Sequence, residues 1–223
     1  MSKTLYRILT WLSPSYPVGA FAYSHGIEWA VETGTIKDEE SLVKWIAPII
    51  QFGGGWTDAV LFKLTYEAAC DIERVREFNE QALALAPSRE RLLETRSQGT
   101  AFLKTTLKAW PWSNSQEITS HLGSDVAYPV AVAIAAHGHG IPLAMAMPAY
   151  LHGITANLVS AGVRLVPLGQ TVGQRTIARF EPIIEKVSEC AITSELRHLG
   201  GIAIQSDIAA MNHETQYTRL FRS

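Results

Sequence analysis

The amino-acid sequence predicts an all-α fold, with residues 1–223 forming a single domain built as a bundle of roughly nine to eleven helices. Apolar residues recur at the three- and four-residue spacing of a helix along most of the chain, whereas convincing strand signals are scarce. Hydrophobic residues make up 47% of the chain and charged residues 18%, which is the balance of a globular protein rather than a disordered one. A chain of 223 residues can also bury a substantial core.

The chain begins with a short predicted helix that ends before Pro14. Its apolar stripe has the spacing i, i+3, i+4, i+7 and consists of Leu5, Ile8, Leu9 and Leu12. Residues 13–26 follow as an ordered loop, because two prolines, two glycines and four aromatic or imidazole rings are concentrated there. A second helix is predicted to start near Ile27 and to stop at Gly34.

Asp38 is the predicted N-cap of a third helix. The buried side of this helix is formed by Leu42, Trp45, Ile46 and Ile49. Residues 53–55, three glycines in a row, then break the helical pattern. They lack the Lys-Ser/Thr pair of a nucleotide-binding P-loop, so they indicate a close-packed junction between helices. A further helix is expected from about Thr57.

Residues 71–86 and 88–110 are predicted to form two more helices, the second capped by Ser88. The stretch 113–124 is polar and is the best candidate for a flexible excursion. The later helices are expected over residues 127–136, 142–166, 170–184 and 206–214. Pro148 lies in the middle of the longest of them and implies a kink or a break there.

Charge and hydropathy argue against a nucleic-acid-binding protein and against a membrane-spanning one. The formal net charge of −2 argues against nucleic-acid binding, and the absence of an 18-residue apolar run argues against a membrane span. The N-terminus lacks the features of a signal peptide, so we expect a cytoplasmic protein. Cys70 and Cys190 have neither CxxC nor Cys/His ligand spacing, and we expect reduced, mostly buried thiols.

His137-Gly138-His139 is the most metal-like feature of the sequence. Metal-binding histidines on a helix usually lie three or four residues apart, and no carboxylate or thiol lies nearby in the sequence. The end of a helix explains His137 and His139 better, and weak surface binding of a divalent ion stays open. No G-x-S-x-G elbow and no acid–base pair stand out, so we expect no catalytic residues, no cofactor and no enzymatic activity.

The C-terminal tail, residues 212–223, is unusual because most chain ends are polar and frayed. Aromatic, aliphatic and arginine side chains of the kinds enriched at protein-binding hot spots continue almost to its last residue. They are Tyr217, Arg219, Leu220, Phe221 and Arg222. A tail that docks on its own domain explains Leu220 and Phe221 equally well, but it explains the arginines less well. We therefore predict that the tail binds a partner.

Three segments in order resemble one known family, the F-type urease accessory proteins. Residues 17–30 (PVGAFAYSHGIEWA) resemble the N-terminal signature of that family, and residues 160–170 (SAGVRLVPLGQ) resemble its central motif. Residues 213–223 (HETQYTRLFRS) are similar to its closing sequence. The resemblance covers essentially the whole chain. Ala22 departs from the usual hydroxyl residue, and His25 stands where we expect Gln or another residue.

The resemblance implies an all-helical homodimer that acts as a non-catalytic adaptor in nickel delivery to urease. Such an adaptor bridges the D-type (or H-type) accessory scaffold and the nickel-carrying G-type GTPase. The complex then docks on apo-urease, where the active-site lysine is carbamylated and nickel is inserted as GTP is hydrolysed.

The resemblance also implies roles for individual residues. Phe21 lies in the loop that matches the surface implicated in recruiting the GTPase, and Tyr23, His25 and Glu28 are predicted to bind partners with it. Arg219 lies in the tail that matches the segment needed for assembly. Arg164 matches a basic position associated with gating of the GTPase, and a structural ion pair or helix-end contact is an equal alternative.

Two other functions stay open at this point. A GTPase-activating protein could donate an arginine to the partner's nucleotide site, and Arg164, Arg219 and Arg222 are the candidates for that role. A weak nickel-binding metallochaperone could use His137, His139 and also His213.

Overall fold

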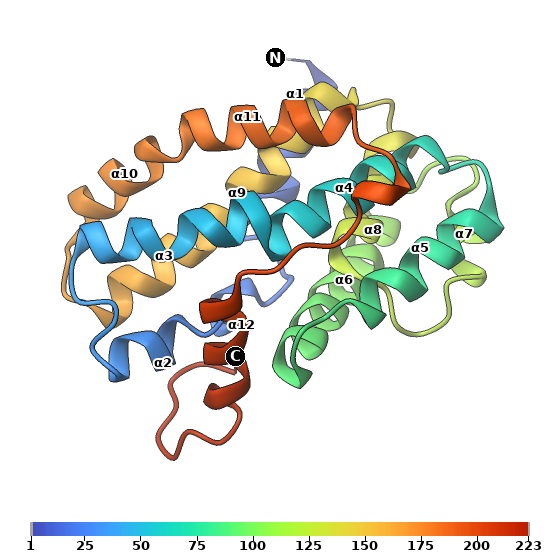
Figure 1. The fold of residues 1–223 in the computed structure, drawn as a ribbon. Coiled ribbons are helices and arrows are strands. Elements are labelled where there is room, and N and C mark those ends of the chain that lie inside the picture. Colours follow the sequence, from blue (N-terminus) through green and yellow to red (C-terminus); the bar gives the residue numbers. More distant parts are fainter. Residues whose placement is uncertain (1, 223) are drawn as a thin grey trace.

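The computed structural model describes residues 2–222 and confirms the all-α class, with no strand in that range (Figure 1). Ser223, the last residue of the predicted tail, lies outside the described residues. Two short 3-10 helices, η1 (Ala20–Ala22) and η2 (Leu196–His198), accompany the α-helices. The α-helices are α1 (Lys3–Trp11), α2 (Ile27–Glu32), α3 (Glu39–Phe52), α4 (Gly54–Glu67), α5 (Ile72–Ala84), α6 (Arg89–Ala109), α7 (Ser115–Ser120), α8 (Tyr128–Gly138), α9 (Leu143–Leu165), α10 (Gln170–Arg179), α11 (Glu181–Ile192) and α12 (Ile204–His213).

Helices α4 and α8 form the centre of the bundle. Most residues of both helices are buried, as is expected for helices at the centre of a bundle. Helix α4 packs against α8, α3, α9, α11 and α5, and α6 covers the other side of α8. Figure 1 shows α3 and α4 running end to end across the molecule, with α10 and α11 along one side and α2 and α12 on the opposite side.

The predicted helix starts and the glycine junction are confirmed. Asp38 accepts a hydrogen bond from the backbone N–H of Ser41 at 2.8 Å, and Ser88 caps α6 in the same way. Gly53 separates α3 from α4. A Cβ atom on Gly55 would lie 2.7 Å from the Cα of Ile50, so this junction is as closely packed as the three glycines indicate.

The sequence pattern does not predict two of the helices, α7 and α11, as separate elements. Residues 113–124, expected as a flexible excursion, contain α7, whose Ile118 is buried against the core. The single helix expected over residues 170–184 is divided at the buried Phe180, and α11 continues to Ile192. The division has a local cause, because Pro182 lies in the first turn of α11, where its missing N–H costs nothing.

Helix α9 runs without interruption from Leu143 to Leu165, through Pro148. The prediction of a break at this proline is therefore wrong. A proline inside a helix removes one backbone hydrogen bond and costs about 3 kcal/mol. The fully buried Met147 and Leu151 lie on either side of Pro148, and their packing offsets this cost.

The expected burial of the two cysteines is also wrong. Cys70 and Cys190 are both free, and both are exposed. Cys70 lies in the turn between α4 and α5, and Cys190 lies on the outer side of α11. No helix formed by residues 2–222 is both long enough and apolar enough to cross a bilayer.

Gly99 marks the closest approach of α6 to the start of α8, and it provides the first testable prediction. A Cβ atom at Gly99 would lie 2.0 Å from the carbonyl oxygen of Val126, so Gly99→Ala forces the two helices apart. We expect this change to lower the free energy of unfolding by about 3 kcal/mol or more. Urea denaturation followed by circular dichroism measures the loss.

Gly153→Ala is the matched control, because Gly153 is also inside a helix, and a Cβ atom added there would meet no other segment closer than 3.8 Å. The higher helix propensity of alanine should leave this variant unchanged or more stable by up to about 1 kcal/mol. Equal stabilities of the two variants would show that α6 and α8 do not meet at Gly99.

Candidate functional site

A buried ionisable cluster holds the start of the C-terminal tail. His213, the last residue of α12, is fully buried. Its Nδ1 lies 2.7 Å from a carboxylate oxygen of Glu90 on α6, and its Nε2 lies 3.0 Å from one of Glu28 on α2. Each of these contacts needs a proton, so either the imidazole carries both or one carboxyl group keeps its own. We refer to Glu28, Glu90 and His213 as the tail latch.

The tail latch also binds the backbone and one arginine of the tail. The two carboxylate oxygens of Glu28 accept hydrogen bonds from the backbone N–H groups of Leu220 and Phe221, at 2.7 and 2.9 Å. Arg219 donates to Glu90 at 2.9 Å. Hydrogen bonds to charged groups are the stronger kind, so the tail folds back onto α2 and α6 after α12.

Arg164, near the end of α9, joins the tail to the loop at residues 13–26. Its guanidinium carbon lies 3.5 Å from the ring centre of Phe21 and 4.4 Å from that of Phe221, so the cation is stacked between two aromatic rings. Partial burial lowers the pKa of Arg164. The backbone N–H of Arg222 donates to the carbonyl of Ala22 at 2.8 Å and completes the junction. We call Phe21, Arg164 and Phe221 the arginine sandwich.

The predicted partner-binding residues divide into an exposed and a buried group. Phe21, Leu220 and Tyr217 are 66%, 80% and 103% exposed, and the partly exposed Arg219 and the exposed Arg222 lie beside them in the tail. Four others are buried within the domain, which excludes direct contact between their side chains and a partner in this conformation. They are Tyr23, His25, Glu28 and Phe221. Of these, Glu28 and Phe221 hold the tail in place.

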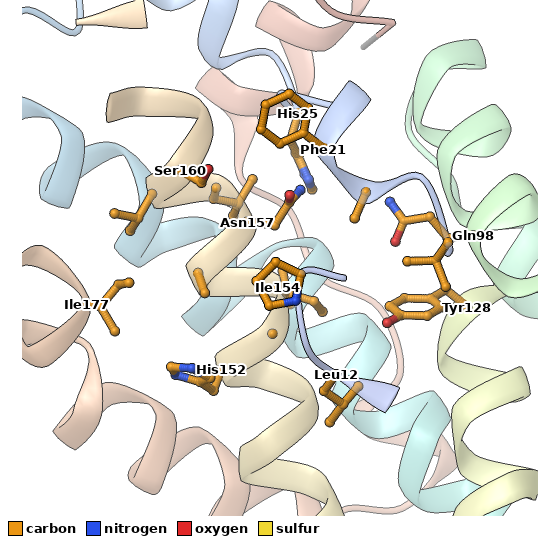
Figure 2. A pocket seen from close by; sticks show the side chains of 18 of the residues that line it. Leu12, Phe21, His25, Gln98, Tyr128, His152, Ile154, Asn157, Ser160 and Ile177 are labelled. Carbon is orange, nitrogen blue, oxygen red and sulfur yellow. The ribbon is translucent and has the colours of Figure 1, made fainter. Parts of the chain in front are cut away.

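A cavity of about 500 Å³ opens next to the arginine sandwich. Figure 2 shows Phe21 and His25 at one end of it, Tyr128 and Gln98 along one wall, and Asn157 of α9 between them. His25 has a left-handed backbone with φ of 58°, which is rare for a residue with a side chain, and this turn directs the chain into α2. The cavity wall combines apolar side chains with a few buried polar groups.

Ionisable side chains line one side of this cavity. Burial raises the pKa of Asp58 to about 6, and Tyr150 donates a hydrogen bond to its carboxylate at 2.9 Å. Burial and the nearby charge of Arg91 hold the pKa of His25 well below its usual value, so its imidazole is neutral at pH 7. Arg91 forms an ion pair with Glu94.

The two histidines that made the sequence look metal-like have separate surroundings. His139 follows the end of α8, and its Nε2 contacts the carbonyl oxygen of Trp110 at 2.9 Å. The Nε2 of His137 lies 3.6 Å from the sulfur of Cys70. Gly140 has a left-handed backbone directly after them, as predicted for the end of a helix. Within residues 2–222, no three His, Cys, Asp or Glu side chains come together as metal ligands.

The loop, the end of α9 and the C-terminal tail together form one exposed surface that is aromatic and basic. Such a surface is typical of a protein-binding module. Comparisons with known proteins identify the family within this class. A family model described as UreF matches residues 36–181, and the chain belongs to the UreF family of urease accessory proteins. It is therefore a non-catalytic accessory protein, as the sequence predicts.

Curated relatives are similar over nearly their full length. The urease accessory protein UreF of Rhodopseudomonas palustris strain BisA53 is 45% identical over 100% of this chain and 94% of its own. The protein of that name from Bradyrhizobium sp. strain BTAi1 is 47% identical over 98% of this chain and 92% of its own. The one from Azorhizobium caulinodans is 45% identical, with 97% and 94% covered.

Sequence reasoning missed Glu90, Arg91 and Asp58. Glu90 lies two residues after the Ser88 cap, where a carboxylate is an ordinary choice because it interacts favourably with the helix dipole. Asp58 and Arg91 belong to different helices and meet only in the folded chain. No local pattern marks these residues, so only the three-dimensional arrangement could reveal them.

Removing one carboxylate of the tail latch should release the tail. In Glu28→Gln one backbone N–H of the tail faces an amide NH2 group instead of an oxygen, and the buried contact with His213 is weakened. We expect a loss of about 3 kcal/mol in the free energy of unfolding. We also expect faster trypsin cleavage after Arg219, because its backbone is no longer held.

Glu32→Gln, on the exposed side of the same helix, is the matched control and should stay within about 0.5 kcal/mol of wild type. A Glu28→Gln protein as stable and as protease-resistant as wild type would contradict the tail latch.

Asp58 should make stability depend on pH. Its pKa is about 6 in the folded protein and 3.8 as an ordinary side chain, so the folded state binds its proton more tightly. The stability that this group contributes is therefore present below about pH 4 and is lost as the pH rises through about 6.

Asp58→Asn removes this dependence, and the difference in unfolding free energy between variant and wild type should change by about 2 kcal/mol from pH 4 to pH 7. Urea denaturation at several pH values measures it. His25 and His139, whose pKa values are lowered by burial, titrate with the opposite sign, but they are present in both proteins and cancel in the difference. Parallel stability curves would show that folding does not raise the pKa of Asp58.

Proposed function

We propose that this chain is the bridging adaptor of a urease maturation complex. In this proposal it connects the D-type (or H-type) accessory scaffold to the nickel-carrying G-type GTPase in the cytoplasm. The assembly docks on apo-urease and supports GTP-dependent nickel insertion and carbamylation of the active-site lysine. The chain acts as a homodimer. Family membership supports the setting, and the single observation that carries the bridging role is the arginine sandwich, which places the loop and the tail on one surface.

The two exposed parts of this surface suit different partners. Phe21 is a large ring held on a constrained loop by Arg164, so it can bind with little loss of conformational freedom. Tyr217 and Leu220 are exposed on the tail, and the backbone N–H of Leu220 is bound by Glu28 of the tail latch. We assign Phe21 to the GTPase and the exposed tail residues to the scaffold.

The stacking of Arg164 favours gating of the GTPase over donation of an arginine finger. A finger must leave its own protein and reach the partner's phosphates, but this guanidinium lies between two rings of its own chain. Arg164 therefore acts by fixing Phe21 for docking. On this proposal Arg164→Ala changes the partner's rate of GTP hydrolysis by a few-fold, whereas the loss of a finger costs about 10³-fold or more.

Co-expression followed by affinity capture tests the bridging role. Wild-type protein should capture both the scaffold and the GTPase. Leu220→Ala combined with Tyr217→Ala should lose the scaffold, and Phe21→Ala should keep the scaffold but lose the GTPase. Tyr6→Ala is the matched control, because Tyr6 is 54% exposed on α1, at the opposite end of the molecule from the tail (Figure 1).

Two outcomes would reject the proposal. Wild-type protein that captures neither partner rejects the adaptor role altogether. Retention of both partners by Phe21→Ala and by the Leu220→Ala and Tyr217→Ala double variant would show that binding does not depend on the surface around the arginine sandwich. Circular dichroism of each variant separates lost binding from lost folding.

A further inference from the structure

We propose that Cys70 and His137 form a binding site for one soft-to-borderline divalent metal ion such as Zn²⁺, Ni²⁺ or Co²⁺. The two residues lie far apart in the sequence, in the turn between α4 and α5 and in the last turn of α8. The site is separate from the arginine sandwich and needs no partner protein. It therefore goes beyond the proposed adaptor function.

The distance between the two ligand atoms fits a shared metal ion. The sulfur of Cys70 lies 3.6 Å from Nε2 of His137. In a tetrahedral site a metal ion lies about 2.3 Å from sulfur and about 2.1 Å from an imidazole nitrogen, which separates the two ligand atoms by about 3.6 Å. Both side chains can therefore bind the same ion without a change of backbone.

The imidazole of His137 is held in its orientation by the neighbouring helix. Tyr66 of α4 contacts it edge to face, with ring centres 5.2 Å apart. The Tyr66 hydroxyl donates to the carbonyl oxygen of Ile141 at 2.8 Å, which fixes the tyrosine ring as well. Restricting a ligand in this way raises metal affinity, because less freedom is lost on binding.

The thiol is accessible and chemically suitable. Cys70 is free and exposed, whereas His137 is half-buried behind it, so an ion can enter from solvent. On binding, the Cys70 thiol loses its proton to solvent and the neutral imidazole donates its Nε2 lone pair, so affinity should rise with pH. A thiolate and an imidazole together select borderline or soft ions over Mg²⁺ and Ca²⁺.

The ion keeps open coordination positions. Among residues 2–222 no third His, Cys, Asp or Glu completes this pair as a metal site, so water fills the remaining positions. A site with two protein ligands binds and releases its ion readily, unlike a closed structural site with four. His139, which the sequence pairs with His137, is not part of it, because its Nε2 contacts the carbonyl of Trp110.

Titration of the full-length protein with Co²⁺ tests the proposal, because a thiolate bound to cobalt gives a charge-transfer band in the near ultraviolet. Wild-type protein should show this band at one equivalent and lose it when Zn²⁺ is added. Cys70→Ser should abolish the band, and His137→Ala should weaken binding by about tenfold or more. Cys190→Ser is the matched control, since Cys190 is also exposed but its thiol makes no hydrogen bond within residues 2–222. Circular dichroism confirms that every variant is folded.

Any of four results would overturn the site. The first three are the absence of a charge-transfer band in wild-type protein, a band that persists in Cys70→Ser, and a band that is lost in Cys190→Ser but not in Cys70→Ser. A band that is unaffected by His137→Ala would also overturn it, because the ion would then be bound by the thiol alone. None of these results depends on capture of the scaffold or the GTPase, so the two proposals fail independently.

Discussion

The buried pairing of His213 with Glu28 and Glu90 is the constraint from which the arrangement of the loop and the tail follows. A carboxylate removed from water costs several kcal/mol unless it is fully hydrogen-bonded. One imidazole meets an oxygen of each carboxylate, but Glu28 still needs further donors. The backbone N–H groups of Leu220 and Phe221 supply them. The backbone of the tail therefore compensates a buried charge, while the side chains of Tyr217 and Leu220 remain exposed.

The arginine sandwich depends on this buried cluster. Hydrogen bonds from the backbone of Phe221 to Glu28 place its ring against Arg164, and Arg164 in turn supports Phe21. A cation–π contact near the surface contributes about 0.5–1 kcal/mol, too little to order a loop and a tail by itself. The exposed surface thus obtains its order from ionisable groups that are buried within the domain. Such preorganisation reduces the entropy that binding must overcome.

Helices, caps and the glycine junction could be predicted from the sequence because they depend on local chemistry. Asp38 and Ser88 cap helices as their positions indicate, and the three glycines join helices in close contact. The candidate site could be predicted only in part. Composition indicates a tail that binds, but only the fold determines that Phe221 points inward and Leu220 outward. The pairing of Cys70 with His137 spans 67 positions, beyond the reach of any spacing rule.

Neighbouring residues in the first turn of α6 connect the tail to the interior of the domain. Glu90 binds His213 and Arg219, whereas Arg91, the next residue, forms an ion pair with Glu94 beside Asp58 and His25 at the cavity. The chain entering this turn is also held by the tail, since Glu214 accepts a hydrogen bond from the backbone N–H of Arg89 at 2.8 Å. Displacing the tail removes hydrogen-bond partners from Arg89 and Glu90 together. The same turn of α6 therefore supplies Arg91 to the cavity and Glu90 to the tail. Order in the tail stabilises this turn and, through it, the polar side of the cavity.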